Sequence, residues 1–221
     1  MKKVSAIIVA AGKGRRFGVP KQFVLLCGKP VLDWCLETIE AEEKISEIVL
    51  VVNKDVPKEK YFRRYGKISS VVNGGERRQD SVISGFKKLD SKKTDIVLVH
   101  DGVRPLVQAA LIEQIISVTE QKGAAIPLIP VEDTIKKVEG QEVLFTLERN
   151  SLFRVQTPQG FFYDILKAGL NKAMKENYYC TDEASLVERA GYKIYAVPGD
   201  YKNIKITNPD DIKIAEAFLG D

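Results

Sequence analysis

The sequence predicts an α/β fold in which helices cover both faces of a mostly parallel sheet. Short apolar runs alternate along the chain with longer segments whose apolar residues recur three and four positions apart. Several short runs are apolar throughout, which is typical of parallel strands buried on both faces. With 221 residues, of which 44% are hydrophobic, the chain has the size of one globular domain. We therefore expect a single domain over residues 1–221.

Each expected strand is a short run rich in Val, Ile and Ala. In a parallel sheet, ligands bind beyond the carboxyl ends of the strands, so the loops that follow the strands are where a site is expected. In chain order the expected strands are "VSAIIVA" at 4–10, "EIVLVV" at 47–52, "ISSVV" at 68–72, "DIVLVH" at 95–100, "AAIPLIP" at 124–130 and "YKIYAVP" at 192–198.

The segments between these strands have the spacing of amphipathic helices and supply the crossover connections that parallel strands need. In chain order they are "PVLDWCLETIEAEEK" at 30–44, "DSVISGFKKL" at 80–89, "QAALIEQIISVTEQ" at 108–121 and "GFFYDILKAGLNKAMKE" at 160–176.

Residues 131–150, "VEDTIKKVEGQEVLFTLERN", interrupt this alternation. Two β-like runs flank a candidate turn at Glu139-Gly140. The second run contains "VLFTL", which is apolar enough to need cover that a lone hairpin cannot supply. We therefore expect a protruding β-arm that packs on a partner chain in a homodimer. An ordinary hairpin at the edge of the sheet is the alternative.

Composition excludes several classes of protein. A net charge of +4 suits a phosphate-bearing small molecule and falls short of a nucleic-acid-binding surface. The three cysteines are scattered, without the spacing of a disulfide framework or a zinc site, which favours the reducing cytoplasm. No apolar run is long enough for a membrane span, and the N-terminus does not resemble a signal peptide.

The loop after the first strand, residues 10–21, contains three glycines and four cations in the stretch "AAGKGRRFGVPK". Its GxGxxxG spacing is one residue longer than the dinucleotide fingerprint, and no GKS or GKT indicates a P-loop. Glycines let backbone N–H groups approach an anion, and Arg16 and Lys21 can bind phosphate oxygens. We interpret the loop as a triphosphate-binding site, with a solvated basic turn as the structural alternative.

Two further loops follow strands. In "NGGERRQDS" at 73–81, the backbone of the two glycines and the Ser81 hydroxyl can read the edge of a base. A helix start capped by Asp80 or Gln79, with Ser81 in the first turn, also explains the pattern. In "VLVHDGVRP" at 97–105, Asp101 faces the expected triphosphate, where one carboxylate can share Mg²⁺ with phosphates. His100, the only histidine, is expected to be structural.

Three further motifs follow these loops: "TPQ" at 157–159, "TDEAS" at 181–185 and "NIKIT" at 203–207. With the loops and these motifs in this order, nearly the whole chain resembles the 2-C-methyl-D-erythritol 4-phosphate cytidylyltransferases. The resemblance implies a Rossmann-like three-layer αβα nucleotidyltransferase fold with a protruding β-arm. It also implies an enzyme of the non-mevalonate isoprenoid pathway. Such an enzyme joins CTP and 2-C-methyl-D-erythritol 4-phosphate, with Mg²⁺, to give 4-diphosphocytidyl-2-C-methyl-D-erythritol and pyrophosphate.

The resemblance also assigns site residues. It implies that Arg16 and Lys21 stabilise the transition state, and that Arg149 and Lys205 position the attacking phosphate. The nucleotide-binding residues that it implies are Ala10, Ala11, Gly12, Gly14, Gly75, Ser81, Asp101 and Gly102, with Asp101 also holding the metal. The substrate-binding residues are Arg104, Thr134, Arg149, Thr157 and Lys205. Thr134 and Arg149 lie on the arm, which this family exchanges between two subunits.

The sequence departs from the family pattern at "HDGVRP", where "HDAARP" is usual, and in a short first loop before Pro20. The "GVRP" variant leaves a ribitol-5-phosphate cytidylyltransferase as one alternative. A regulator that binds CTP without turnover is another, although such a protein would need neither Lys205 nor Arg149.

Overall fold

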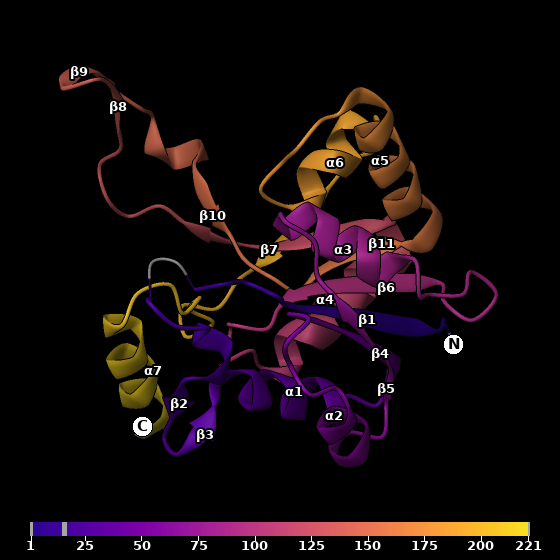
Figure 1. Ribbon diagram of the computed structural model, residues 1–221. Helices are drawn as coiled ribbons and strands as arrows, with labels where there is room; N and C mark the ends of the chain where they lie inside the picture. The colour runs from indigo at the N-terminus through magenta and orange to yellow at the C-terminus, as the bar shows by residue number, and fades with distance from the viewer. Residues whose placement is uncertain (1, 15–16, 221) are drawn as a thin grey trace.

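In the computed structural model, which describes residues 2–14 and 17–220, eight strands of the described chain form one sheet (Figure 1). The sheet order is β10-β7-β11-β6-β1-β4-β5, with β12 beside β7. These strands are β1 (Val4–Ala10), β4 (Ile45–Val52), β5 (Ile68–Asn73), β6 (Ile96–Asp101), β7 (Ala124–Pro130), β10 (Phe153–Val155), β11 (Gln159–Phe162) and β12 (Tyr195–Pro198).

Strand β1 lies at the centre and is parallel to β4 on one side and β6 on the other. Strand β4 is parallel to β5, and β12 is parallel to β7. Only β10 and β11, among the described strands of this sheet, run antiparallel to their neighbours. The expected mostly parallel sheet is therefore confirmed, and β1, β4, β5 and β6 end at one common edge.

Two hydrophobic cores cover the two faces of the sheet. Alternate residues of β1 point to opposite faces, so Ile8 packs in one core and Ile7 in the other. Figure 1 shows α5 and α6 on one side of the sheet and α1 and α2 on the other, which gives the expected three layers. The helices are α1 (Val31–Ala41), α2 (Glu59–Arg64), α3 (Arg78–Phe86), α4 (Ala109–Lys122), α5 (Tyr163–Glu176), α6 (Glu183–Arg189) and α7 (Asp210–Gly220).

The six expected strands and four expected helices are all present, with shifted ends. Helix α1 ends at Ala41, and α3 begins two residues earlier than expected. The expected helix at 160–176 was wrong at its start, because Gly160 and Phe161 belong to β11 and pair with β6 and β7. A side chain at Gly160 would meet Thr119 Oγ1 at 2.4 Å, so α4 packs directly on that strand.

Helix α7 and a short ribbon of β2 (Leu25–Leu26) and β3 (Lys29–Pro30) lie beside each other at one side of the molecule (Figure 1). A small apolar cluster that includes Leu26, Val103 and Ile206 joins them to the loop after β6. The backbone N–H of Ile206 donates to the Val103 carbonyl at 2.9 Å. This contact brings the C-terminal segment 203–207 next to the third predicted loop.

The arm contains a separate two-stranded ribbon, β8 (Lys136–Glu139) and β9 (Glu142–Thr146), with Gly140 at its turn. Figure 1 shows it projecting away from the sheet, so it is not an edge hairpin of that sheet. Every residue of both strands is exposed, including Val143 and Phe145. Within this chain, the apolar side chains that were expected to need cover therefore lack it.

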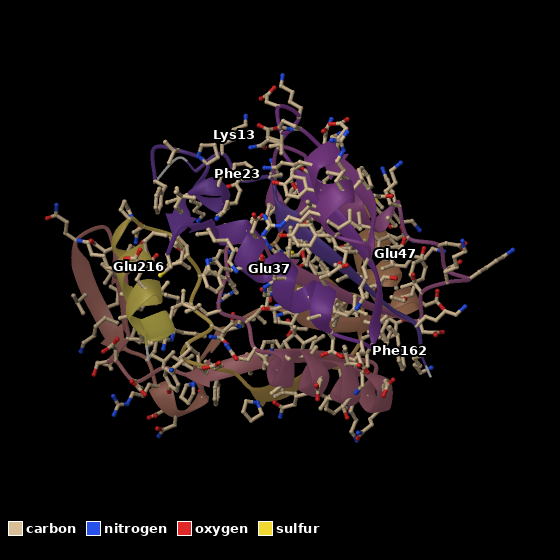
Figure 2. All side chains as sticks on the ribbon, turned by 90° about the horizontal axis from the view of Figure 1, so that it is seen from below. Lys13, Phe23, Glu37, Glu47, Phe162 and Glu216 are labelled. Carbon is tan, nitrogen blue, oxygen red and sulfur yellow. The ribbon has the colours of Figure 1, made fainter. Side chains whose placement is uncertain are left out.

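Figure 2 shows the molecule from below, with Lys13 and Phe23 together on one side and Phe162 on the opposite side. Lys13 follows the carboxyl end of β1, whereas Phe162 pairs with Ile96 at the start of β6. The glycine-rich loop thus lies at the edge where ligands are expected. Among the described residues, the helices are too short or too polar for any of them to span a membrane.

Candidate active site

The three predicted loops meet at the carboxyl edge of the sheet around a cleft of about 500 Å³. Five lining residues are lysine or arginine, against two carboxylates, so the cleft is strongly cationic. The lining consists of Val9, Ala10, Ala11, Gly12, Lys13, Gly14, Lys21, Gln22, Gly75, Glu76, Arg77, Arg78, Ser81, Asp101, Val103 and Lys205. Seven of the eight predicted nucleotide-binding residues are in this lining, and Gly102 lies between two members of it.

A larger groove of about 960 Å³ lies between the end of α1 and the start of α4. Its charged lining residues are three glutamates, Glu42, Glu43 and Glu113, and one lysine, Lys44. An acidic lining repels phosphate, so the smaller cationic cleft is the better candidate for a nucleotide site.

The first loop is shaped by its glycines and by a buried glutamine. Gly14 has φ +66°, and a Cβ there would meet the Val19 carbonyl oxygen at 1.8 Å, so only glycine fits. Gln22 is 1% exposed and donates to the carbonyl oxygens of Ala10 and Gly12 at 2.8 and 3.1 Å. These contacts anchor the turn that contains Gln22 to the end of β1 and the start of the loop. The predicted catalytic Arg16, and Arg15 beside it, lie outside the described residues.

Lys21 begins the short 3₁₀ helix Lys21–Phe23, directly before Gln22, and lines the cleft. Because Gln22 fixes this turn against β1, the position of Lys21 relative to the glycines is set by the same contacts.

The second loop packs against the first with almost no space between them. A Cβ at Gly74 would meet the Ala11 Cβ at 2.2 Å. The backbone N–H of Gly75 donates to Ser81 Oγ at 3.2 Å, and the Ser81 hydroxyl donates to the Arg77 carbonyl. Gly75 and Ser81 therefore lie where they were predicted, on the cleft wall. The N-cap residue of α3 is Arg77 and not Asp80. Asp80 lies in the first turn of the helix, and its carboxylate accepts a hydrogen bond from the Arg77 backbone N–H at 3.1 Å.

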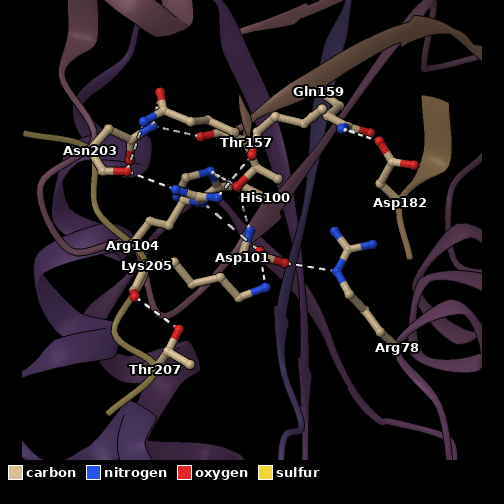
Figure 3. Close-up of polar contacts among 12 residues, drawn as sticks. Arg78, His100, Asp101, Arg104, Thr157, Gln159, Asp182, Asn203, Lys205 and Thr207 are labelled. Atoms are coloured by element: carbon tan, nitrogen blue, oxygen red, sulfur yellow. Dashed lines mark hydrogen bonds and ion pairs between the residues drawn. The ribbon is translucent and has the colours of Figure 1, made fainter. Parts of the chain in front are cut away.

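Asp101, at the end of β6, is the centre of the site (Figure 3). Its Oδ1 accepts from Arg78 Nε at 2.8 Å, and its Oδ2 lies 2.8 Å from Lys205 Nζ. Arg104 Nε is 3.9 Å from the same Oδ2. The backbone N–H of Asp101 donates to Thr157 Oγ1 at 3.1 Å. Cations from three separate segments thus surround one carboxylate whose side chain is 7% exposed.

The electrostatics keep this carboxylate ionised. Burial alone would raise the pKa of Asp101, but Arg78, Lys205 and Arg104 together hold it well below its usual range. The same carboxylate and Glu183 raise the pKa of Arg78 despite its burial, so Arg78 is a permanent cation. Lys205 keeps a side chain that is 38% exposed and can still reach a ligand in the cleft.

A second cleft, of about 490 Å³, shares Arg78, Asp101 and Lys205 with the first. It is also lined by the predicted substrate residues Arg104 and Thr157. Two buried guanidinium nitrogens at this border, Arg78 Nη2 and Arg104 Nε, have no hydrogen-bond partner in the described part of the chain. Unpaired buried donors are costly and favour a bound anion. The structure therefore provides a strongly cationic cleft and an adjoining cleft that shares Asp101 with it. The second cleft is lined by three cations, Arg78, Arg104 and Lys205, and by three carboxylates, Asp101, Asp182 and Glu188.

Arg104 and Thr157 are buried rather than freely exposed. Arg104 Nη1 donates to the Asn203 carbonyl at 2.7 Å, which ties the third loop to the segment that carries Lys205. Thr157 Oγ1 lies 3.0 Å from His100 Nδ1. Both residues thus position the site as well as lining it.

The two predicted residues of the arm are not at the clefts. Thr134 and Arg149 are exposed, and neither is among the described residues that line the two clefts of this chain. The Arg149 guanidinium donates to the carbonyl of Glu132, within the arm.

The donor set fits a magnesium ion that is held mainly by phosphates. Among the described residues, no group of three or more His, Cys, Asp or Glu side chains is arranged to hold a metal ion. Asp101 supplies one ionised, hard oxygen ligand beside a phosphate-binding cleft, and Mg²⁺ commonly takes one or two carboxylates together with substrate phosphates. Asp101 is the described residue that would hold it.

Sequence reasoning missed Arg78, Gln22 and Glu183. Arg78 and Glu183 stand inside quoted motifs, but they are 105 positions apart, and nothing in the local pattern indicates that they meet. Glu183 Oε1 accepts from Arg78 Nη1 at 2.7 Å, a contact that only the fold creates.

A family model for 2-C-methyl-D-erythritol 4-phosphate cytidylyltransferase matches residues 4–221. The curated protein of that name from Geotalea uraniireducens is 41% identical over 98% of this chain and 97% of its own length. The one from Geobacillus thermodenitrificans is 43% identical over 97% of this chain and 96% of its own.

Solved structures of proteins from the same family are also similar to this chain. The crystal structure of 4-diphosphocytidyl-2C-methyl-D-erythritol synthase from Anaerococcus prevotii superposes with a TM-score of 0.87 at 34% identity, covering 100% of this chain and 97% of that one. The Thermus thermophilus 2-C-methyl-D-erythritol 4-phosphate cytidylyltransferase gives a TM-score of 0.83 at 29% identity, with 100% of both chains covered.

The buried His100 gives a testable pH dependence of stability. Burial lowers the pKa of His100 to about 3, so the native protein keeps it neutral while the unfolded chain protonates it below about 6.5. The unfolded state therefore binds more protons, and the free energy of unfolding falls as the pH drops below about 7, with a slope that steepens to about 1.4 kcal/mol per pH unit near pH 5. Urea titrations at pH 7, 6 and 5 should show this slope, and His100→Asn should remove it. Equal slopes in the two proteins would contradict the burial of a neutral histidine.

Proposed function

Because the chain belongs to the 2-C-methyl-D-erythritol 4-phosphate cytidylyltransferase family, we infer that it joins CTP and 2-C-methyl-D-erythritol 4-phosphate. The products are 4-diphosphocytidyl-2-C-methyl-D-erythritol and pyrophosphate, in the non-mevalonate isoprenoid pathway. The observation that carries this function is a strongly cationic cleft next to a second cleft, with Arg78, Asp101 and Lys205 lining both. The relatives' names favour the erythritol substrate over ribitol phosphate, and an enzyme over a regulator.

Two anions must meet in this reaction. An oxygen of the polyol phosphate attacks the α-phosphorus of CTP, a new P–O bond forms, and the bond to the departing pyrophosphate breaks. The nucleophile is already an anion, so the site needs no general base. Catalysis depends on holding the reactants in line and on stabilising the charge that builds on the phosphoryl oxygens and the leaving group.

We propose that the first cleft binds CTP. The backbone of Gly12 and Gly14 faces the triphosphate, and Gly75 and Ser81 face the cytosine. Lys21 lies on the same wall and neutralises the phosphates, as Arg16 does by resemblance. One cation about 4 Å from a phosphate charge contributes about 1 kcal/mol in water and about 4 kcal/mol near a protein surface. Several cations together can therefore offset the cost of desolvating the triphosphate.

We propose that Asp101 holds Mg²⁺ together with the CTP phosphates. The ion would neutralise charge on the phosphates during transfer. In this structure Lys205 Nζ contacts Asp101 Oδ2, so a cation already balances the carboxylate oxygen that faces the clefts.

The second cleft is proposed to bind the polyol phosphate. Lys205 and Arg104 supply positive charge at the border of the first cleft, on the side where the attacking oxygen must approach. Arg149 and Thr134 would complete this cleft from the arm of a second copy of the chain. The exposed Val143 and Phe145 of the arm support such an exchange, because apolar side chains on a protruding ribbon gain stability from burial in an interface. The three unpaired cysteines support a cytoplasmic location.

Pyrophosphate release tests the function. The protein is incubated with Mg²⁺, each nucleoside triphosphate in turn, and either 2-C-methyl-D-erythritol 4-phosphate or ribitol 5-phosphate. We expect pyrophosphate only with CTP and the erythritol substrate. Release with ribitol phosphate alone, or binding of CTP without release, would contradict the proposed function.

Replacing Lys21 tests the proposed charge stabilisation. Lys21→Ala should lower kcat by about 10²- to 10³-fold, the scale of losing one transition-state contact, while circular dichroism stays native. Arg16→Ala should behave in the same way. Lys54→Ala, which removes an exposed lysine away from both clefts, is the control and should leave kcat unchanged. Normal turnover of the Lys21 variant would remove its proposed role.

Mixing two inactive variants tests whether the arm acts on the partner subunit. Lys205→Ala and Arg149→Ala are each purified, unfolded and refolded together. If the arm is exchanged, each mixed dimer contains one site with both residues intact, and random pairing should restore about a quarter of wild-type activity. If Arg149 acts within its own chain, no site is intact and no activity returns.

A further inference from the structure

Arg78 joins two buried carboxylates that come from distant parts of the chain. Its Nε donates to Asp101 Oδ1 at 2.8 Å, and its Nη1 donates to both oxygens of Glu183 at 2.7 and 2.8 Å. Arg78 begins α3, Asp101 ends β6, and Glu183 begins α6. Figure 3 shows Arg78 approaching Asp101 from the side opposite Arg104, with Lys205 between them.

The contact with Glu183 restrains the Arg78 guanidinium beside Asp101. A guanidinium presents its N–H groups as a fork and readily binds both oxygens of one carboxylate. Here both oxygens of Glu183 hold Nη1, which restrains the rotation of the guanidinium. Asp101 receives one bond, from Nε to Oδ1, and Nη2 has no hydrogen-bond partner among the described residues. The other oxygen, Oδ2, stays available to Lys205 Nζ at 2.8 Å.

Stability alone does not explain a glutamate at this position. Glu183 is 1% exposed, and its burial raises its pKa even though Arg78 opposes the shift. A buried ion pair costs about as much in desolvation as it gains in attraction, and apolar residues of similar size are often as stable. A role of Glu183 in positioning Arg78 accounts for its charge.

We propose that Glu183 is a positioning residue for cytidylyl transfer. It acts through Arg78, fixing the guanidinium so that Asp101 Oδ2 and Lys205 face the reactants at the border of the two clefts. This inference rests on the proposed function, because the groups it positions are those assigned to the reaction.

Glu183→Gln tests the proposal, since it keeps the size and removes the charge that holds Arg78. We expect kcat to fall roughly 10-fold or more and KM for the polyol phosphate to rise, while the calorimetric Kd for CTP changes less than about threefold. The matched control is Asp33→Asn. Asp33 is another buried carboxylate bound by a bridging arginine, Arg64, which also contacts Glu37, and none of these three residues lines either cleft. The control should keep kcat within about twofold.

A double variant that combines Glu183→Gln with Arg78→Lys separates a positioning role from a general loss of stability. Arg78→Lys keeps the charge but cannot span two carboxylates, so it should lower kcat to a similar extent. Both changes break the same arrangement, and their combined effect on kcat should be less than the product of the single effects. Wild-type kcat in Glu183→Gln, or effects that multiply, would overturn the proposal. If the glutamine variant does not fold, Glu183→Asp, which keeps the charge on a shorter side chain, should have a kcat below that of the wild-type protein. Wild-type turnover of the aspartate variant would also contradict the proposal.

A crystal structure of Glu183→Gln gives a result that does not depend on turnover. We expect the Arg78 guanidinium to turn so that it binds both oxygens of Asp101, and Lys205 to leave Oδ2. An unchanged Arg78 would overturn the inference. Failure of the proposed function would instead show as a wild-type protein that releases no pyrophosphate, so the two failures are distinguishable.

Discussion

The site depends on one buried carboxylate that must remain charged. Asp101 is 5% exposed at the end of a central strand, and isolation there would favour its protonated form. Arg78, Arg104 and Lys205 prevent this, and each comes from a different segment of the chain. Docking of those segments on the sheet is therefore coupled to the charge state of Asp101. Loss of this carboxylate would leave three cations close together, of which Arg104 is buried and Arg78 is half-buried.

The same arrangement joins the two clefts. Arg78, Asp101 and Lys205 line both, so a group bound in either one changes the electrostatic environment of the other. Two phosphate anions that must approach each other repel, and a shared wall of cations lowers that repulsion where it is greatest. This explains why the chain has no need of a nucleophilic serine or a histidine base. Its single histidine is buried and neutral behind Thr157.

Local patterns predicted most of the sheet and all three loops, because buried parallel strands and glycine-rich turns have strong signals over a few residues. They failed where distant parts of the chain decide the outcome. The apolar run at 160–162 continues a helical pattern, yet pairing with β6 and β7 makes it a strand. Glu183 looks like any first-turn acid of a helix until the fold places it against Arg78. Thr134 and Arg149 are exposed on the arm and line neither cleft of this chain, and no local pattern predicts where the arm packs.

A crystal structure of the protein with CTP and Mg²⁺ tests most directly whether cations at this sheet edge bind the reacting phosphates. We expect the triphosphate along Gly12 and Gly14, in contact with Lys21, and Asp101 close to the α-phosphate. A triphosphate bound elsewhere, such as in the groove between α1 and α4, would contradict the assignment of the site and of every residue placed in it.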